Sequence, residues 1–184
     1  MPKSATILMI RHAEKPASGT GLSMMGQQRA QAYSIYFQNY LLNGKALNLN
    51  YLFAAEDSKQ SNRSLLTITP FSKATGLPID AKHKNDDYPD VVHDLTNHSK
   101  YDGANILICW HHGKLLDFAK ALGVESSKLP ATANWPSNWP DEVFGWLLQL
   151  VFDANGSIDP IQTICISQKL MFGDNGQMPA GPNA

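Results

Sequence analysis

ATILMIRHAEKP, residues 5–16, carries an uninterrupted apolar run straight into an arginine, a histidine and a glutamate. The apolar part, residues 5–10, is typical of a short strand covered on both faces, as in a parallel sheet. A strand that ends on Arg11 and His12 either ends in water or directs both side chains at an anion. Ligands of parallel sheets bind at the carboxyl ends of the strands, which favours the second interpretation.

Two more strand-then-helix units follow. NYLFAA (residues 50–55) and ANILICW (residues 104–110) both have the composition of buried strands. The first predicted helix covers residues 24–42. The second begins near Ser58 or Ser61 and is disturbed by Pro70. The third is the segment HHGKLLDFAKAL, which stops at Gly123. Short joints between strands and helices predict an α/β fold, a three-layer α/β/α sandwich with a mostly parallel central sheet.

The last third of the chain has a weaker pattern. Residues 131–142 form a loop rich in proline and tryptophan, and WLLQLVF, a DANG turn and TICIS over residues 146–167 are consistent with a hairpin. Residues 174–184 are expected to be a mobile tail. No internal repeat or linker is visible, so one domain is predicted over residues 1–184.

Composition excludes several partners. The 184 residues include 15 Lys and Arg against 16 Asp and Glu, so the chain has no basic excess for nucleic acid. No signal peptide or membrane-spanning stretch is apparent, which predicts a cytoplasmic protein with no membrane partner. Cys109 and Cys165 lie in apolar runs and are expected to be buried thiols. The sequence makes no prediction of oligomeric state.

Two arginines and a pair of histidines suit phosphoryl transfer. The planar guanidinium groups of Arg11 and Arg63 can each hold phosphoryl oxygens through paired hydrogen bonds. His12 could attack phosphorus if its reactive nitrogen is unprotonated. His111 and His112 follow another strand of the same predicted sheet and should reach the same edge. No metal or organic cofactor is expected, because two arginines aimed at one point would repel a cation.

These residues carry a resemblance to the histidine phosphatase superfamily, which includes the phosphoglycerate mutases. The family begins with Arg-His-Gly, here Arg11-His12-Ala13, and continues with a motif matched by GLSMMGQQRA at residues 21–30. An arginine four residues ahead of a threonine is matched by Arg63 and Thr67, and ILICWHHG matches the strand that delivers a second histidine. The resemblance covers residues 5–123 and implies a phosphoglycerate mutase-like fold.

The resemblance also implies roles. His12 would be the nucleophile that becomes a phosphohistidine, Arg11 and Arg63 would bind the phosphate, and a second histidine would donate to a phosphate oxygen. The spacing between histidine and leucine in the following helix favours His111 for that part. His112 remains an alternative for the second histidine, because it is the one directly followed by Gly113.

The sequence departs from the family pattern at three positions, and its acidic residues supply the candidates for a proton donor. Ala13 replaces the family glycine, and Lys59 and Gln60 replace a common serine and proline. The proton donor of the family commonly lies between the second and third motifs, where this chain offers few carboxylates. The candidates for donating a proton or contacting substrate are Asp86, Asp87 and Asp90, with Glu14 less favoured as a donor and with Glu14 and Lys15 at the rim. The shortness of this interval predicts an open site.

The predicted function is hydrolysis of a phosphomonoester or phosphoramidate through a phosphohistidine on His12. The substrate would be a phosphorylated small molecule or a phosphoprotein, and inorganic phosphate would be the product. One alternative is a phosphoglycerate mutase-like phosphotransferase, which would need a lid that this chain has little sequence to build. Another is a regulatory module that binds phosphate without turnover.

Overall fold

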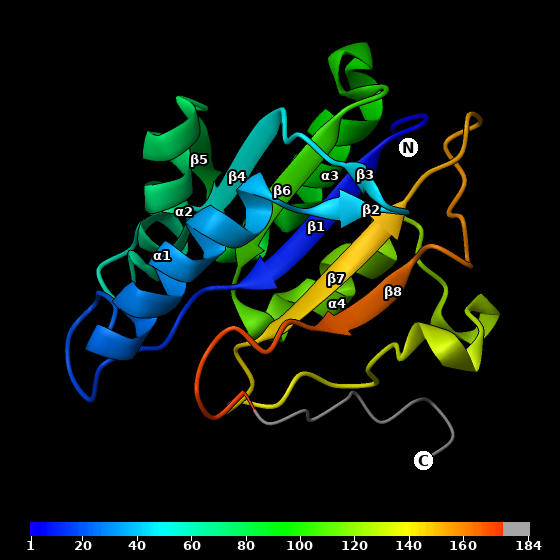
Figure 1. Cartoon of the computed structure of the whole chain (residues 1–184). Coiled ribbons are helices and arrows are strands. Elements are labelled where there is room, and N and C mark those ends of the chain that lie inside the picture. The colour runs from blue at the N-terminus through cyan, green and yellow to red at the C-terminus, as the bar shows by residue number, and fades with distance from the viewer. Residues whose placement is uncertain (175–184) are drawn as a thin grey trace.

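The computed structural model of the chain describes residues 1–174 (Figure 1). In chain order its elements are β1 (Thr6–Arg11), α1 (Met24–Gln38), β2 (Leu41–Leu42), β3 (Lys45–Ala46), β4 (Tyr51–Ala55), α2 (Arg63–Thr75), β5 (Ile79–His83), the 3-10 turn η1 (Asn85–Asp87), α3 (Tyr88–Asn97), η2 (Ser99–Tyr101), β6 (Asn105–Trp110), α4 (His112–Ala121), η3 (Ser126–Lys128), η4 (Ala131–Ala133), β7 (Trp146–Val151) and β8 (Ile164–Ser167).

A six-stranded sheet in the order β5-β4-β6-β1-β7-β8 forms the centre of the molecule. The pairs β5–β4, β4–β6 and β6–β1 are parallel, whereas β7 is antiparallel to both β1 and β8. The prediction of a mostly parallel sheet is therefore confirmed. Strands β1 and β6 are buried almost throughout, as expected for strands covered on both faces.

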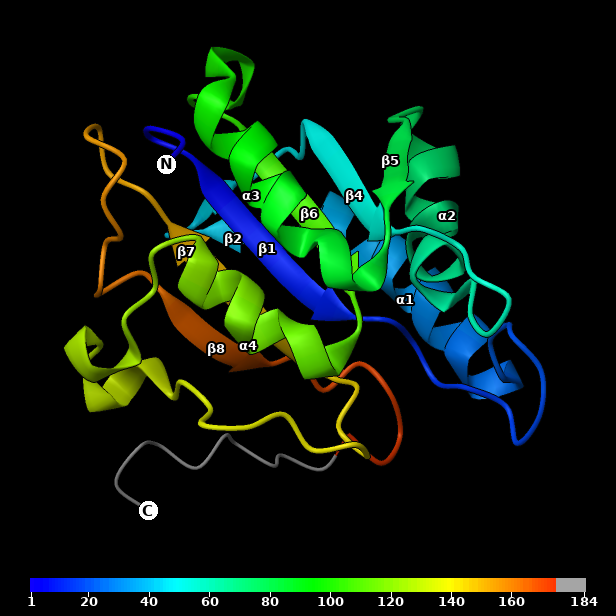
Figure 2. The ribbon, with the colours of Figure 1, turned by 180° about the vertical axis from the view of Figure 1, so that it is seen from behind.

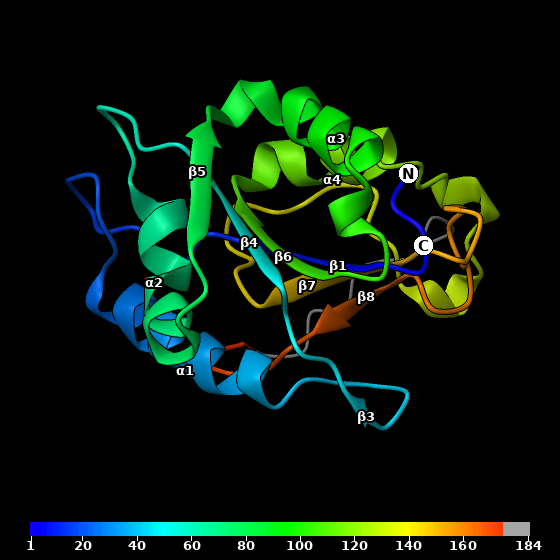
Figure 3. The same cartoon turned by 90° about the horizontal axis from the view of Figure 1, so that it is seen from above.

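Helices cover both faces of the sheet (Figures 2 and 3). Helices α1 and α2 pack on one face, where Leu8, Ile10, Tyr33, Phe37 and Ile68 belong to one apolar cluster. Helices α3 and α4 pack on the other face, over a second cluster. The alternating side chains of β1 divide between the two clusters, since successive residues of a strand point to opposite faces. This arrangement confirms the predicted three layers.

The structure corrects the bounds of two predicted helices. Helix α1 ends at Gln38 instead of Leu42, because residues 41–46 form the short ribbon β2–β3. Helix α2 begins at Arg63, because Ser58 and Ser61 bond to each other in a turn. Pro70 lies inside α2, and the helix continues past it to Thr75.

A fourth strand-and-helix unit, β5 and α3, lies in the interval that follows α2 and was not predicted. Strand β5 reads IDAKH and is half-buried at the edge of the sheet, so it lacks the apolar run that marks an inner strand. Helix α3 has a better amphipathic pattern, with Val91 and Leu95 buried against α4.

The C-terminal third agrees with the predicted hairpin, formed by β7 and β8. Asp174, the first residue of the predicted tail, binds Arg29. The other residues of that tail, 175–184, lie outside the described part of the chain, and the single domain over residues 1–184 stays a prediction. Among residues 1–174, no helix combines the length and apolar character needed to cross a membrane.

Candidate active site

The ends of β1 and β6 place two histidines side by side. Arg11 pairs in register with Trp110, and the backbone N–H of His12 donates to the Trp110 carbonyl at 3.0 Å. His12 and His111 follow these paired residues directly. Their ring centroids lie 5.0 Å apart in an edge-on arrangement. Two histidines separated by nearly a hundred positions in the sequence thus share one edge of the sheet.

The tautomer of His12 is defined by its own backbone. Its Nδ1 lies 2.8 Å from the carbonyl oxygen of Ala13, which can only accept a hydrogen bond, so Nδ1 carries the proton. The lone pair of the neutral ring is therefore on Nε2. Burial lowers the pKa of His12 to about 3, and the nearby charges of His111, Arg11 and Arg63 act in the same direction. The ring is neutral at pH 7 and available as a nucleophile.

Arg11 is anchored by the loop that precedes β7. Its Nη1 donates to the carbonyls of Asp141 at 2.6 Å and Val143 at 3.0 Å, with a longer contact to Pro140. The guanidinium carbon lies 3.8 Å from the ring centroid of Phe144. Burial lowers the pKa of Arg11 to about 10, so the group stays charged at neutral pH. Its Nε is buried and has no hydrogen-bond partner among the described residues.

Arg63 is the first residue of α2 and approaches the same place from the opposite side of β1. The start of α2 is tied to the end of β1, because Thr67 bonds both the Arg63 carbonyl and the Ala13 N–H. The charge of Arg63 lowers the pKa of both His12 and His111. Nη1 donates to the Thr20 carbonyl at 3.2 Å, while Nε is buried and lacks a partner within residues 1–174. The structure thus brings Arg11, His12, Arg63 and His111 together, and the buried Nε of each arginine has no hydrogen-bond partner among the described residues.

Thr67 ties α2 to the end of β1. Its hydroxyl accepts from the Ala13 N–H at 2.8 Å and donates to the Arg63 carbonyl at 2.7 Å. The spacing of Arg63 and Thr67 seen in the sequence therefore has a physical reason. One helical turn separates the arginine from the hydroxyl that fixes the helix against the strand end.

His111 and His112 face different neighbours. The ring of His111 meets that of His12 edge-on, and burial, followed by the charge of Arg63, lowers the pKa of His111 to about 4. His112 places Nε2 at 2.6 Å from the carboxylate of Asp141. Of the two histidines, His111 is therefore the one whose ring contacts His12. Asp141 was missed in the sequence, because it lies in a loop without a recognisable motif.

Glu14 contacts an arginine instead of facing an open rim. Its carboxylate accepts from Nε and Nη2 of Arg29 at distances down to 2.7 Å. Asp174 binds the other side of the same guanidinium, also at 2.7 Å. Arg29 is only 2% exposed and, through Glu14, fixes the loop after His12 to α1.

The remaining predicted residues lie on the outer side of the site. Asp86 is exposed in η1 and pairs with Lys114 at 2.9 Å, and its charge raises the pKa of His111 against the larger effect of burial. Asp87 follows it in the same turn, and Asp90 is exposed on α3. Lys15 is exposed, and its charge lowers the pKa of His112.

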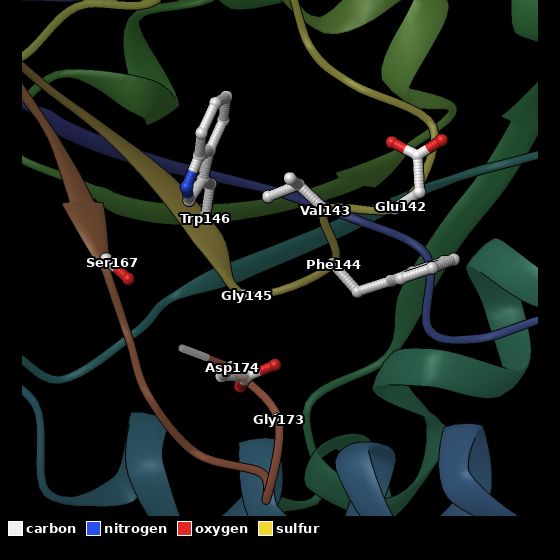
Figure 4. Close-up of a pocket in the computed structure, with 8 residues that line it drawn as sticks. All are labelled: Glu142, Val143, Phe144, Gly145, Trp146, Ser167, Gly173 and Asp174. Carbon is white, nitrogen blue, oxygen red and sulfur yellow. The ribbon is translucent and has the colours of Figure 1, made fainter. Parts of the chain in front are cut away.

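A cavity of about 280 Å³ adjoins the loop that holds Arg11 (Figure 4). It is lined by residues 142–146 together with Ser167, Gly173 and Asp174. Asp174 faces Gly145, and a Cβ at Gly145 would come within 3.0 Å of its carboxylate. Phe144 belongs both to this lining and, through its ring, to the Arg11 contact. Within residues 1–174, no three His, Cys, Asp or Glu side chains are arranged to hold a metal ion.

The order of strands and the placement of the helices define a phosphoglycerate mutase-like α/β fold. No family model and no curated protein sequence matches the chain. Solved structures do match it, at low sequence identity. The protein histidine phosphatase SixA complexed with tungstate is 14% identical with a TM-score of 0.53, over 89% of this chain and 97% of that one.

Two further structures agree with this match. Chains assigned as phosphohistidine phosphatase SixA from Nakamurella multipartitia and from Agrobacterium tumefaciens are each 15% identical, with TM-scores of 0.52 and 0.50. They cover 87% and 81% of this chain, and 91% and 93% of their own length. The fold expected from the sequence is therefore found in solved structures over most of its length.

Proposed function

We propose that the protein is a phosphatase that hydrolyses a phosphomonoester or phosphoramidate through a phosphohistidine on His12. The observation that carries this proposal is the bond from His12 Nδ1 to the Ala13 carbonyl at 2.8 Å. It leaves Nε2 unprotonated beside two arginines whose buried Nε atoms lack partners among residues 1–174. A neutral nucleophile surrounded by fixed positive charge suits attack on a phosphate dianion.

The reaction has two steps. Nε2 of His12 forms a bond to phosphorus while the bond from phosphorus to the leaving oxygen or nitrogen breaks, and the leaving group takes that electron pair and a proton. Water then attacks the phosphohistidine, the bond between phosphorus and Nε2 breaks, and inorganic phosphate leaves. Arg11 and Arg63 hold the equatorial oxygens, and His111 donates to one of them, since its ring lies against that of His12.

The names of the structural neighbours support a phosphoramidate, and among phosphoramidates a phosphohistidine on a protein. The absence of a large insertion before β6 supports a site that a protein surface could approach. Small phosphomonoesters are also proposed as substrates, because the proposed residues contact the phosphoryl group, which phosphomonoesters and phosphoramidates share. The two cysteines, both free and buried, are consistent with work in the cytoplasm.

The test is release of phosphate from an aryl phosphate and from a phosphohistidine peptide near pH 6. His12→Ala should abolish turnover, whereas the matched variant His93→Ala, at an exposed position on α3, should retain it. Turnover that survives in His12→Ala would contradict the proposal. Transfer to an added alcohol without release of phosphate would indicate the phosphotransferase. Tight binding of phosphate without turnover in the wild type would indicate the regulatory module.

A further inference from the structure

The identity of the proton donor can be addressed from the structure. Glu14 is bound by Arg29 on one side of the loop, and Asp86 is exposed and paired with Lys114. Each of these carboxylates has a cationic partner of its own. His112 is a further titratable group, directly next to His111 in the chain, and its ring contacts Asp141.

His112 has one ring nitrogen engaged and one free. Nε2 lies 2.6 Å from Asp141 Oδ1, and the Asp141 side chain is 81% exposed, so this edge of the ring faces the rim. Nδ1, on the other side of the ring, is buried and has no hydrogen-bond partner among the described residues. In the imidazolium form both nitrogens donate, so Asp141 would accept one proton while Nδ1 presents the other.

Asp141 connects His112 to the phosphate-binding residue. Its backbone carbonyl accepts from Arg11 Nη1 at 2.6 Å, while its carboxylate meets His112. One residue of the loop thus sets the position of both groups. A base or acid oriented by a third group is the arrangement that proton transfer requires.

Resting on the proposed phosphatase function, we infer that His112 is the general acid of the site and that Asp141 is the positioning residue that holds it. In the first step the Nδ1 proton of His112 passes to the leaving atom as its bond to phosphorus breaks, and His112 becomes neutral. In the second step the attacking water gives a proton back to Nδ1 as the bond between phosphorus and His12 breaks. The cycle returns His112 to its protonated form and releases phosphate.

The charges around His112 set the pH at which this acid operates. Burial lowers its pKa below the ordinary value near 6.5, and Arg11 and Lys15 add to this effect, while Asp141 opposes it. His111, the residue before His112, is the other titratable group next to it, and the two charges oppose each other. The acid form therefore decreases as pH rises toward neutrality, and turnover should decrease with it. Loss of the Asp141 carboxylate should move that decrease to still lower pH.

The experiment compares leaving groups. General acids contribute roughly 10²–10⁴-fold where the leaving group is basic. His112→Gln should therefore lower the rate with an alkyl phosphate by about 100-fold. The same variant should lower the rate with 4-nitrophenyl phosphate far less, because that leaving group needs little protonation. Equal losses with both substrates would overturn the inference. His12→Ala tests the nucleophile separately, because it should abolish turnover of both substrates.

We expect Asp141→Asn to fold, since the Asp141 side chain is exposed and the backbone carbonyl of the residue remains available to Arg11. The limb of the pH profile on the alkaline side should move to lower pH, and the pKa of His112 measured by NMR titration should fall even without turnover. Glu142→Gln, the neighbouring exposed residue, is the control. An unmoved His112 pKa, or a shift of the limb in Asp86→Asn instead, would overturn the inference.

Discussion

At the scale of single residues, the site depends on which ring nitrogen of His12 is unprotonated and on which arginine N–H groups have no partner among the described residues. A carbonyl acceptor at Ala13 defines which nitrogen of His12 is free. Carbonyl acceptors in the β7 loop bind one nitrogen of Arg11, while its Nε stays without a partner within residues 1–174. Buried donors of this kind are costly unless an anion binds them, which is the physical reason for the proposal that a phosphoryl group binds here.

Arg63→Ala should weaken phosphate binding and lower kcat/KM together, because one guanidinium serves both the bound and the reacting phosphoryl group. We expect a loss of roughly 10²-fold in kcat/KM, about 2.7 kcal/mol at 1.36 kcal/mol per tenfold. Lys73→Ala, an exposed cation at the end of the same helix, is the control and should change neither quantity. An unchanged rate in Arg63→Ala would remove this residue from the site.

The lowered pKa values of His12 and His111 predict a loss of stability in acid. Their folded pKa values of about 3 and about 4 lie below the unfolded value near 6.5. Between these limits the unfolded chain binds more protons, so the free energy of unfolding falls as pH is lowered. Urea unfolding at pH 7.5 and pH 5 should show this difference. It should shrink in His12→Asn and persist in His93→Asn; an equal difference in both would contradict the assignment.

At the scale of elements, two helices are fixed against the loop that follows β1. Helix α2 is held through Thr67, and α1 is held through a close backbone approach. A Cβ on Gly26 would collide with the backbone oxygen of Glu14, so this position of α1 requires glycine. The glycine of the motif at residues 21–30 thus serves packing of the helix against the loop.

Gly26→Ala should therefore destabilise the protein by about 1–3 kcal/mol, because the added methyl pushes α1 away from Glu14. Chemical denaturation measures the change. Gly113→Ala is the control, since a Cβ there would meet no atom within 4 Å and α4 should tolerate it. A Gly26→Ala variant as stable as the wild type would show that the loop moves freely.

Thr67→Val keeps the shape of the side chain and removes the hydroxyl that accepts from the Ala13 N–H. An unpaired buried N–H costs about 1–3 kcal/mol, so urea unfolding should show a loss of that order. Thr69→Val is matched, because Thr69 makes the same bond to the carbonyl four residues earlier, at 2.8 Å, without holding another element. Equal losses in both variants would show that the link to β1 contributes nothing.

At the scale of the whole molecule, Arg29 joins three regions. It lies in α1, binds Glu14 in the loop after the candidate nucleophile, and binds Asp174 beyond β8. Its side chain is 2% exposed, and its two partners are 13% and 12% exposed. Glu14 and Asp174 share this guanidinium, and Asp174 also accepts from the Met171 N–H at 3.0 Å, so the end of the described chain is linked electrostatically to the site.

Arg29→Met should destabilise the protein by about 3–5 kcal/mol, since it removes the cationic partner of two largely buried carboxylates. Lys128→Met, which breaks an exposed pair with Glu125, is the control and should change stability by less than about 1 kcal/mol. Urea unfolding of both variants makes the comparison. A small effect in Arg29→Met would show that water replaces the guanidinium easily.

Much of the fold could be predicted from local patterns, because the apolar runs of β1, β4 and β6 and the stripes of their helices are properties of neighbouring residues. The edge unit β5 and α3 could not, since an edge strand such as IDAKH is half-exposed and carries no such run. The boundaries of α1 and α2 were wrong where turns competed with the helix.

The sequence by itself determined the parallel sheet, its strand ends and the two arginines and two histidines that the motifs place there. Only the tertiary structure decided that Arg11 rests on carbonyls 130 and 132 positions away, that Asp141 holds His112, and that Arg29 reaches Asp174. The physical reason is distance along the chain. Periodicity reports which side of an element is buried, whereas contacts between remote loops follow from how the packed layers bring those loops together.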